Sequence, residues 1–367
     1  MTDFAFAEAA DADAPTLATR CAEKLGTAVH GHTLGFVYAT PQIADALGEV
    51  VAALRSATGI EDWVGTIGLG VCATGIEHFE KPALSVMTAN LPGGAHRMIP
   101  LISKPEGAKN GAEPAFAAGL GVVHGDPRNQ ATPDIVRALA AERGAFLVGG
   151  LSASDGAQPQ VAGAIVDGGV SGVLIAQDIP VAVGLSQGCS PVGTLHEVTE
   201  AEETIVVSLD GRPALEVLLE DVGVAEDADP RPWLQNIHAA KLIPGTDTGD
   251  YLVRNLVGIE PKAGLVVIGE AAEAGETLLF VRRDVEAAAK DLQRMLEDLK
   301  LRAGAKPKGG LYFSCIARGP NLFQPPGHEL TAIREAFGEF PLAGFFGNGE
   351  ISHDRLYGYT GVLVLFL

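Results

Sequence analysis

The chain has 367 residues, of which 47% are hydrophobic and 20% are charged, and its formal net charge at pH 7 is −20. This length favours two domains over one, and the composition is that of a packed globular protein rather than a disordered chain. The negative charge would repel a phosphate backbone, so we expect no nucleic-acid partner.

The cysteines are scattered, without a C-x-x-C pair, at Cys21, Cys72, Cys189 and Cys315. This spacing predicts neither a zinc site nor a disulfide framework, and we expect no metal and no cofactor. The first residues lack the basic start and apolar core of a signal peptide, and no apolar run reaches membrane-spanning length. We therefore expect a cytoplasmic chain without a membrane partner.

A strand–helix–strand pattern occurs three times in chain order, each time followed by further apolar strands. Its segments are 34–39, 41–58, 63–70 and 83–91 in the first copy, 120–125, 132–144, 146–154 and 161–176 in the second, and 310–319, 328–338, 341–350 and 359–367 in the third. Thr40 is expected to cap the first helix ahead of Pro41, and Gly144 is expected in a left-handed C-cap after the second.

Strand–helix–strand units usually make right-handed crossovers between parallel strands, and the strands that follow are expected to pair antiparallel. The predicted fold is therefore α/β with α+β character, in which mixed sheets are built from repeated strand–helix–strand–hairpin units in two related domains. Hairpins are predicted over residues 161–176 and 264–284 and at the Gly347-Asn348-Gly349 turn, and a helix over 285–300.

An acidic, proline-containing stretch at residues 225–232 is the best candidate for a domain boundary. It separates two predicted domains, over residues 27–230 and 231–367. An N-terminal extension is predicted over residues 1–26, of which the first 15 are expected to fray or to form a short helix.

The third copy brings two glycine-containing corners to one rim, because loops at the carboxyl ends of parallel strands line the same crevice. One corner holds Arg318 and Gly319, and the other holds Asn348, Gly349 and Glu350. A guanidinium can hold a ligand carboxylate through paired hydrogen bonds, Asn348 and the glycine amides can bind polar atoms, and Glu350 can accept from an ammonium group. The alternative is that both corners are plain turns joined by an Arg318–Glu350 salt bridge.

Two side chains could act as nucleophiles. Cys315 lies three residues before Arg318, which could lower the pKa of the thiol if the two converge, although a buried inert thiol is the usual state. Ser186 lies in a G-x-S-x-G sequence at residues 184–188, but Pro191 and Gly193 stand where the helix of a nucleophile elbow should begin.

Several stretches together resemble the FIST family of paired N- and C-terminal sensory domains, which occur in bacterial signalling proteins and beside an F-box in some eukaryotes. The matching stretches are FLVGGLSA (146–153), QGCSPVG to LDGRPALEVL (187–218), YLVRNLVGIEP (251–261), FSCIARG (313–319), PLAGFFGNGEI (341–351) and YGYT (357–360). The resemblance covers roughly residues 30–365 in the family's order.

The resemblance implies a soluble module that binds a small ligand, such as an amino acid or a related metabolite, and takes part in signal transduction. The motif positions that it carries over to the ligand site are Gly149, Gly150, Gly188, Cys189, Pro191, Cys315, Arg318, Gly319, Asn348, Gly349 and Glu350. Gly188, Cys189 and Pro191 are expected to flank a turn. With no output domain beyond the two halves, the chain is expected to report through a separate signalling protein. The alternatives are an enzyme with a Cys315 or Ser186 nucleophile and a ligand-free interaction scaffold.

Overall fold

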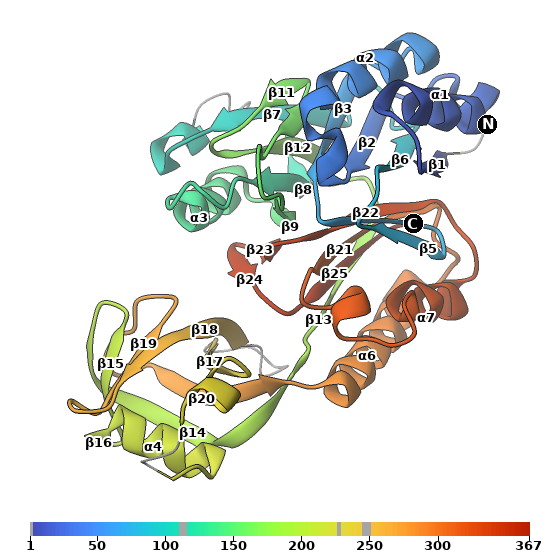
Figure 1. Ribbon diagram of the computed structural model, residues 1–367. Coiled ribbons are helices and arrows are strands. Elements are labelled where there is room, and N and C mark those ends of the chain that lie inside the picture. The colour runs from blue at the N-terminus through green and yellow to red at the C-terminus, as the bar shows by residue number, and fades with distance from the viewer. Residues whose placement is uncertain (1–2, 110–115, 226–228, 244–250) are drawn as a thin grey trace. The chain divides into compact units, whose positions relative to one another are not determined.

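A computed structural model describes residues 3–109, 116–225, 229–243 and 251–367 of the chain (Figure 1). The chain divides into two compact units: unit 1 comprises residues 1–186 and 291–367, and unit 2 comprises residues 187–290. The boundary predicted after residue 230 falls inside unit 2.

Unit 1 contains three six-stranded sheets. The strands of sheet 1 are, in order across the sheet, β1 (Phe4–Ala10), β6 (Ala83–Ala89), β2 (Leu34–Ala39), β3 (Asp62–Ile67), β10 (Gln160–Ala162) and β11 (Ala164–Val166). Those of sheet 2 are β24 (Arg355–Tyr357), β23 (Glu350–His353), β9 (Phe146–Leu151), β8 (Ala118–Gly125), β12 (Val170–Ala176) and β7 (His96–Ile102). Those of sheet 3 are β13 (Val181–Ser186), β25 (Gly361–Phe366), β21 (Gly309–Cys315), β22 (Leu342–Gly347), β4 (Gly70–Ala73) and β5 (Ile76–Phe79). The predicted mixed sheets of an α+β fold are confirmed.

Each sheet is built around one of the three repeats. The strand pairs β2–β3, β8–β9 and β21–β22 are parallel, as the strand–helix–strand pattern predicts. A later strand of the same copy (β6, β12 or β25) pairs antiparallel with the first strand of each pair. All three copies lie in unit 1.

The hairpin that follows each parallel pair belongs to another sheet. β4 and β5 follow β3 of sheet 1 but extend sheet 3, β10 and β11 follow β9 of sheet 2 but extend sheet 1, and β23 and β24 follow β22 of sheet 3 but extend sheet 2. Three hairpins are thus exchanged in a cycle.

Two hairpin predictions are wrong because of this exchange. β22 and β23, on either side of Gly347-Asn348-Gly349, lie in different sheets. At this corner the chain therefore passes from sheet 3 to sheet 2 and does not form a hairpin turn. Within residues 161–176, β10 pairs with β11, whereas β12 pairs with β7 and β8 of sheet 2.

The inner faces of the three sheets share one hydrophobic core, and helices cover the outer faces (Figure 1). The helical segments of unit 1 are α1 (Ala14–Leu25), α2 (Leu47–Thr58), α3 (Thr132–Arg143), α7 (His328–Phe337) and the 3₁₀ turns η1 (Gly26–Val29), η2 (Pro41–Ala46), η3 (Pro105–Lys109) and η4 (Gly319–Asn321). α1 and α2 cover sheet 1, α3 covers sheet 2, and α7 packs on sheet 3 with α6 (Val285–Ala303).

The helix ends follow the sequence signals in part. α3 ends before Gly144, which has the predicted left-handed conformation (φ 60°). Thr40 makes no side-chain capping bond and instead donates to the carbonyl oxygen of Lys81, because Pro41 opens a 3₁₀ segment rather than an α-helix. Residues 4–25 are not a loose extension, since β1 pairs along its whole length with β6 and α1 packs on the same sheet.

Unit 2 is an antiparallel sheet with α4 against it. Its elements are β14 (Cys189–Glu202), β15 (Ile205–Leu209), β16 (Arg212–Pro213), β17 (Ile237–Leu242), β18 (Tyr251–Glu260), β19 (Leu265–Ile268), β20 (Thr277–Arg283), α4 (Ala214–Val222) and α5 (Arg231–Leu234). The hairpin predicted over 264–284 is wrong, because β19 pairs with β15 and β18 while β20 pairs with β14 and β17. The long helix predicted over 285–300 is α6.

Candidate functional site

Loops from all three repeats meet around one cavity of unit 1, which we call the strand-end cavity. Gln42 follows β2, Asp155 follows β9, and Ile316 follows β21, so each loop leaves the carboxyl end of a strand in a parallel pair. This is the edge at which α/β proteins bind ligands, because the strand ends there open into loops that are free to vary. The sequence also predicted a site at strand ends, but none of the residues that it named lines this cavity.

The strand-end cavity has a volume of about 710 Å³, which is the size of a small-molecule site. Its lining combines apolar side chains with three carboxylates and one ammonium group. The lining residues are Pro41, Gln42, Leu69, Glu77, Phe79, Glu80, Lys81, Asp155, Ile316, Pro320, Asn321 and Pro326. Sequence reasoning missed the residues of β5 and its flank, because their convergence with the β21 loop depends on the exchange of the β4–β5 hairpin.

Arg318 lies beneath the cavity loop rather than in the cavity. Its side chain is fully buried, and its Nε donates to Glu329 Oε1 at 2.8 Å in a buried ion pair. Burial alone would lower the pKa of Arg318, but the Glu329 carboxylate outweighs it and raises the pKa further above its usual range. The sequence suggested a salt bridge between Arg318 and Glu350, and this is wrong, because the partner of Arg318 is Glu329.

Glu329 organises a buried polar cluster on the outer face of sheet 3. Its carboxylate accepts from the Tyr312 hydroxyl at 2.7 Å, the Ser314 hydroxyl at 3.1 Å and the Gly319 amide at 3.1 Å. Arg318 Nη2 also donates to Ser186 Oγ at 3.3 Å. These bonds fix the loop that carries Ile316, Pro320 and Asn321 into the cavity wall. A glutamate among the buried apolar positions of α7 was the sequence signal that could have indicated this cluster.

Glu350 is buried, and only one of its two carboxylate oxygens accepts hydrogen bonds among the described residues. Its Oε2 accepts from the Thr360 hydroxyl at 2.6 Å and the Thr360 amide at 3.3 Å, whereas Oε1 has no hydrogen-bond partner among the described residues. Burial raises the pKa of the Glu350 carboxyl to about 8, so the group is mostly protonated at neutral pH. No hydrogen bond joins Glu350 to Arg318 in the part of the chain that the structure describes.

Cys315 is close enough to Glu350 for their charges to interact. Burial, and after it the Glu350 carboxylate, raise the pKa of the Cys315 thiol to about 12, against the smaller opposite effect of Arg318. A thiol in this state is almost entirely protonated at neutral pH, and the thiolate is the nucleophile. The activation by Arg318 that the sequence suggested is therefore outweighed.

The predicted glycines of unit 1 are brought together by backbone pairing. Gly149 and Gly150 of β9 pair with β23, where Glu350 lies opposite Gly150, and the Gly349 carbonyl accepts from the Leu151 amide. Gly319 has φ 49°, and a Cβ there would lie 2.9 Å from the Phe346 ring, so only glycine fits. Asn348 is exposed where the chain passes from sheet 3 to sheet 2, and its backbone N–H donates to the Leu151 carbonyl.

The remaining predicted residues lie in unit 2. Cys189 and Pro191 pair with β20 along β14, so they belong to a strand and not to the predicted turn. The carbonyl of Gly188 accepts from the Asp284 amide, and the carbonyl of Cys189 accepts from the Tyr251 hydroxyl at 2.9 Å.

Ser186 does not occupy a nucleophile elbow. It is the last residue of β13, its side chain is buried, and β14 follows it instead of a helix. The sharp strand-to-helix turn that exposes a nucleophilic serine is missing at this position.

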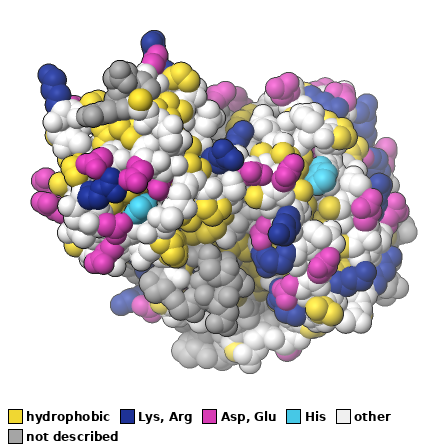
Figure 2. Space-filling view, turned by 90° about the horizontal axis from the view of Figure 1, so that it is seen from below, with side chains coloured by type: hydrophobic (Ala, Val, Ile, Leu, Met, Phe, Trp, Pro, Cys, Tyr) yellow, Lys and Arg dark blue, Asp and Glu magenta, His cyan; other side chains and the backbone are white. Residues whose placement is uncertain are grey.

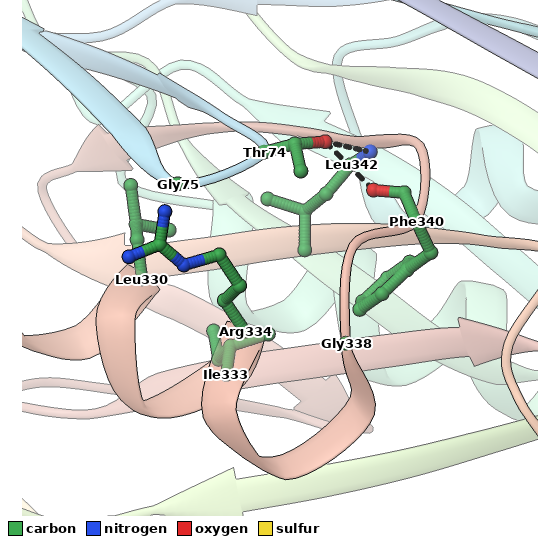
Figure 3. Close-up of a pocket in the computed structure, with 8 residues that line it drawn as sticks. All are labelled: Thr74, Gly75, Leu330, Ile333, Arg334, Gly338, Phe340 and Leu342. Carbon is green, nitrogen blue, oxygen red and sulfur yellow. Dashed lines mark hydrogen bonds between the residues drawn. The ribbon is translucent and has the colours of Figure 1, made fainter.

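Two further hollows are smaller. Between the β4–β5 turn and α7, a pocket lined by Thr74, Leu330 and Arg334 holds about 10 Å³, enough for a single water-sized group (Figure 3). In unit 2, a surface hollow of about 400 Å³ lies between α4 and the β18–β19 turn.

Neither a patch of like charges nor a metal-binding cluster suggests a second site among the described residues. Acidic and basic side chains are interspersed over the face shown in Figure 2. No group of three or more His, Cys, Asp or Glu side chains there could hold a metal ion. None of the described helices combines the length and the apolar character needed to cross a membrane.

His196 forms a carboxylate–imidazole–carboxylate cluster in unit 2. Its Nδ1 lies 2.6 Å from Asp210 Oδ2 and its Nε2 lies 2.9 Å from Asp221 Oδ2. Burial lowers the pKa of His196, but the hydrogen bonds to both carboxylates outweigh it and raise the pKa above its ordinary value. The protonated imidazole thus links β14 to the β15–β16 turn and to α4.

This cluster predicts that unit 2 loses stability as the pH rises above neutrality. A histidine whose pKa is raised on folding contributes stability that is complete below its unfolded pKa and is lost as the pH passes through the folded value. We expect the urea midpoint of unit 2 to fall between pH 6.5 and 9 in the wild type, and to fall less in His196→Gln. Parallel pH profiles for the two chains would contradict this. His238, whose pKa burial lowers to about 4, stays neutral throughout this range.

Comparison with known families gives two adjoining matches. The FIST N domain matches residues 33–212 and the FIST C domain matches residues 214–353, so the two family domains meet near residue 213.

Individual relatives cover less of the chain. Uncharacterized protein Rv0628c of Mycobacterium tuberculosis is 36% identical over 211 residues, which is 55% of each chain, and uncharacterized protein Mb0898c of Mycobacterium bovis is 32% identical over 216 residues, 55% of this chain and 54% of that protein. Human F-box only protein 22 is 44% identical over 57 residues, 15% of this chain and 14% of that protein. The matches to the mycobacterial relatives thus span about half of their length.

Proposed function

Because the chain belongs to the FIST family, whose domains are associated with sensory signal transduction, we propose that it is a sensory protein that binds a small polar metabolite in the strand-end cavity. The observation that carries this proposal is the convergence of loops from three repeats on a cavity of about 710 Å³. An amino acid or a related metabolite is the ligand class proposed first, and a separate cytoplasmic signalling protein is the proposed receiver.

The roles of the predicted site residues follow their positions. Arg318 and Gly319 hold the loop that forms one wall of the cavity, through Glu329, and thereby position Ile316 and Pro320. Gly149, Gly150, Gly349 and Glu350 join sheet 2 to the exchanged β23. In this proposal the ligand contacts come from the loop residues themselves, and the buried cluster keeps the loop in place.

A thermal-shift screen against amino acids and central metabolites tests the proposal. A ligand at 100 times its Kd stabilises the folded state by about 2.7 kcal/mol, which raises the Tm of a domain of this size by about 5–10 °C. We expect such a shift for at least one compound in the wild type, and its loss in Gln42→Trp, which places a large ring in the cavity.

Gln293→Trp is the matched control, since Gln293 is exposed on α6 and does not line the cavity. Shifts that survive Gln42→Trp would place the ligand elsewhere, and a screen without any shift would remove the proposal.

A further inference from the structure

We infer that the strand-end cavity is selective for an aliphatic primary amine without a free carboxylate, and that Glu77 accepts its ammonium group. This inference rests on the proposed function and, among small polar metabolites, selects amines over amino acids. It is carried by the position of Glu77, the charge of the cavity and its apolar wall.

Glu77 has one oxygen committed to the fold and one that is not. Oε1 accepts from the Gly327 amide at 2.7 Å, at the N-terminal end of α7, whereas the buried Oε2 has no hydrogen-bond partner among the described residues. A buried carboxylate oxygen without a donor is costly, and burial accordingly raises the pKa of this carboxyl. Because Oε2 is closed to water in this conformation, a turn of the Glu77 carboxylate would bring it to an ammonium group in the cavity, which supplies the missing donor and positive charge.

The charges around the cavity favour a cation over a zwitterion. Glu77, Glu80 and Asp155 contribute three carboxylates, and Lys81 contributes one ammonium group, so the lining carries a net formal charge of −2 (one minus three). Lys81 is itself paired with Asp11 at 3.0 Å, which lies outside the lining. A ligand carboxylate would therefore meet a negative field, while an ammonium group would be attracted.

An apolar wall accompanies the carboxylates. Leu69, Phe79, Ile316 and Pro320 line the same cavity and can cover a short hydrocarbon chain. Phe79 and Glu77 are two residues apart on β5, so both side chains face the same side of the strand. An aromatic ring beside a carboxylate is a favourable setting for an ammonium group, because the ring face attracts cations.

The test uses compounds with the same four-carbon chain on the full-length protein. Butylamine, 2-aminobutyrate and butyrate each have four carbons and carry the ammonium group, both groups and the carboxylate, respectively. By isothermal titration we expect butylamine to bind at least about tenfold more tightly than 2-aminobutyrate, and butyrate not to bind.

Tighter binding of 2-aminobutyrate or butyrate than of butylamine would overturn the amine class but leave a metabolite-binding cavity. If none of the three binds while another compound of the metabolite screen gives a shift that Gln42→Trp abolishes, the inference alone fails. If no compound of either set binds, the proposed function fails with it.

Glu77→Gln isolates the proposed contact. The amide keeps an oxygen for the Gly327 amide and removes the charge, so we expect an unchanged melting temperature in the absence of ligand. Butylamine affinity should fall by about 10- to 100-fold, the effect of losing a hydrogen bond to a charged group. Glu80→Gln, an exposed carboxylate of the same lining, is the control and should change the affinity by less than about threefold. Equal losses in the two variants would show a diffuse field in place of a specific acceptor.

Discussion

Replacing Gly149 by alanine is expected to leave unit 1 unable to fold. A Cβ on Gly149 would lie 1.8 Å from the carbonyl oxygen of Val123 on the neighbouring parallel strand, and the residue has φ 137°, which other residues rarely adopt. The obstacle is backbone on a central strand, so it cannot move without breaking the β8–β9 register. The expected measurement is the absence of a cooperative melting transition in purified or refolded protein.

Gly144→Ala and Gly48→Ala are the controls for this effect. Gly144 also has a left-handed conformation, but nothing lies within 4 Å of its Cβ position, so we expect a loss of about 1–2 kcal/mol. Gly48 lies inside α2 with its nearest neighbour at 3.5 Å, where alanine should be neutral or stabilising by up to about 1 kcal/mol. Gly149→Ala protein that melts within a few degrees of the wild type would refute the close approach of β8 and β9.

Replacing Arg318 by methionine is expected to destabilise unit 1 by about 3–5 kcal/mol, because it leaves the Glu329 carboxylate buried without its cationic partner. Urea denaturation monitored by far-UV circular dichroism measures the loss. The double variant Arg318→Met/Glu329→Gln should be more stable than Arg318→Met alone, since the amide removes the orphaned charge and keeps an oxygen that can accept from the buried donors around it.

Arg334→Ala, at an exposed position of α7, is the control and should change stability by no more than about 0.5 kcal/mol. A double variant as unstable as the sum of its single variants would show that the two side chains do not act as a pair.

The local order of the fold was predictable from the sequence. Apolar strands, helical spacing and the glycine at position 144 are set within a few residues, and they predicted three parallel pairs that the structure contains. The sheet to which each following hairpin belongs was not predictable in this way. The β22–β23 corner has the glycines of a hairpin turn, but its second strand finds its partner in β9, about 200 residues earlier in the chain.

The sequence predicted a site at the strand ends, but none of the residues that it named lines the strand-end cavity. The carboxyl ends of the β21–β22 pair were the predicted location, and the strand-end cavity adjoins the β21 loop. A one-dimensional pattern cannot decide which carboxylate pairs with Arg318, because Glu329 and Glu350 are both within reach of a long side chain on a neighbouring loop. The choice is made by α7, which turns Glu329 inward onto sheet 3.

The cyclic exchange of hairpins has a consequence for biosynthesis. During translation sheet 1 can be completed once β11 has been made, whereas sheet 2 waits for β23 and β24 and sheet 3 waits for β21, β22 and β25, all near the end of the chain. Separate expression of the segments on either side of residue 213 would also split sheets 2 and 3, since each draws strands from both segments. The nascent chain therefore exposes unpaired strand edges until its last strands leave the ribosome. During this period a chaperone could bind the exposed edges.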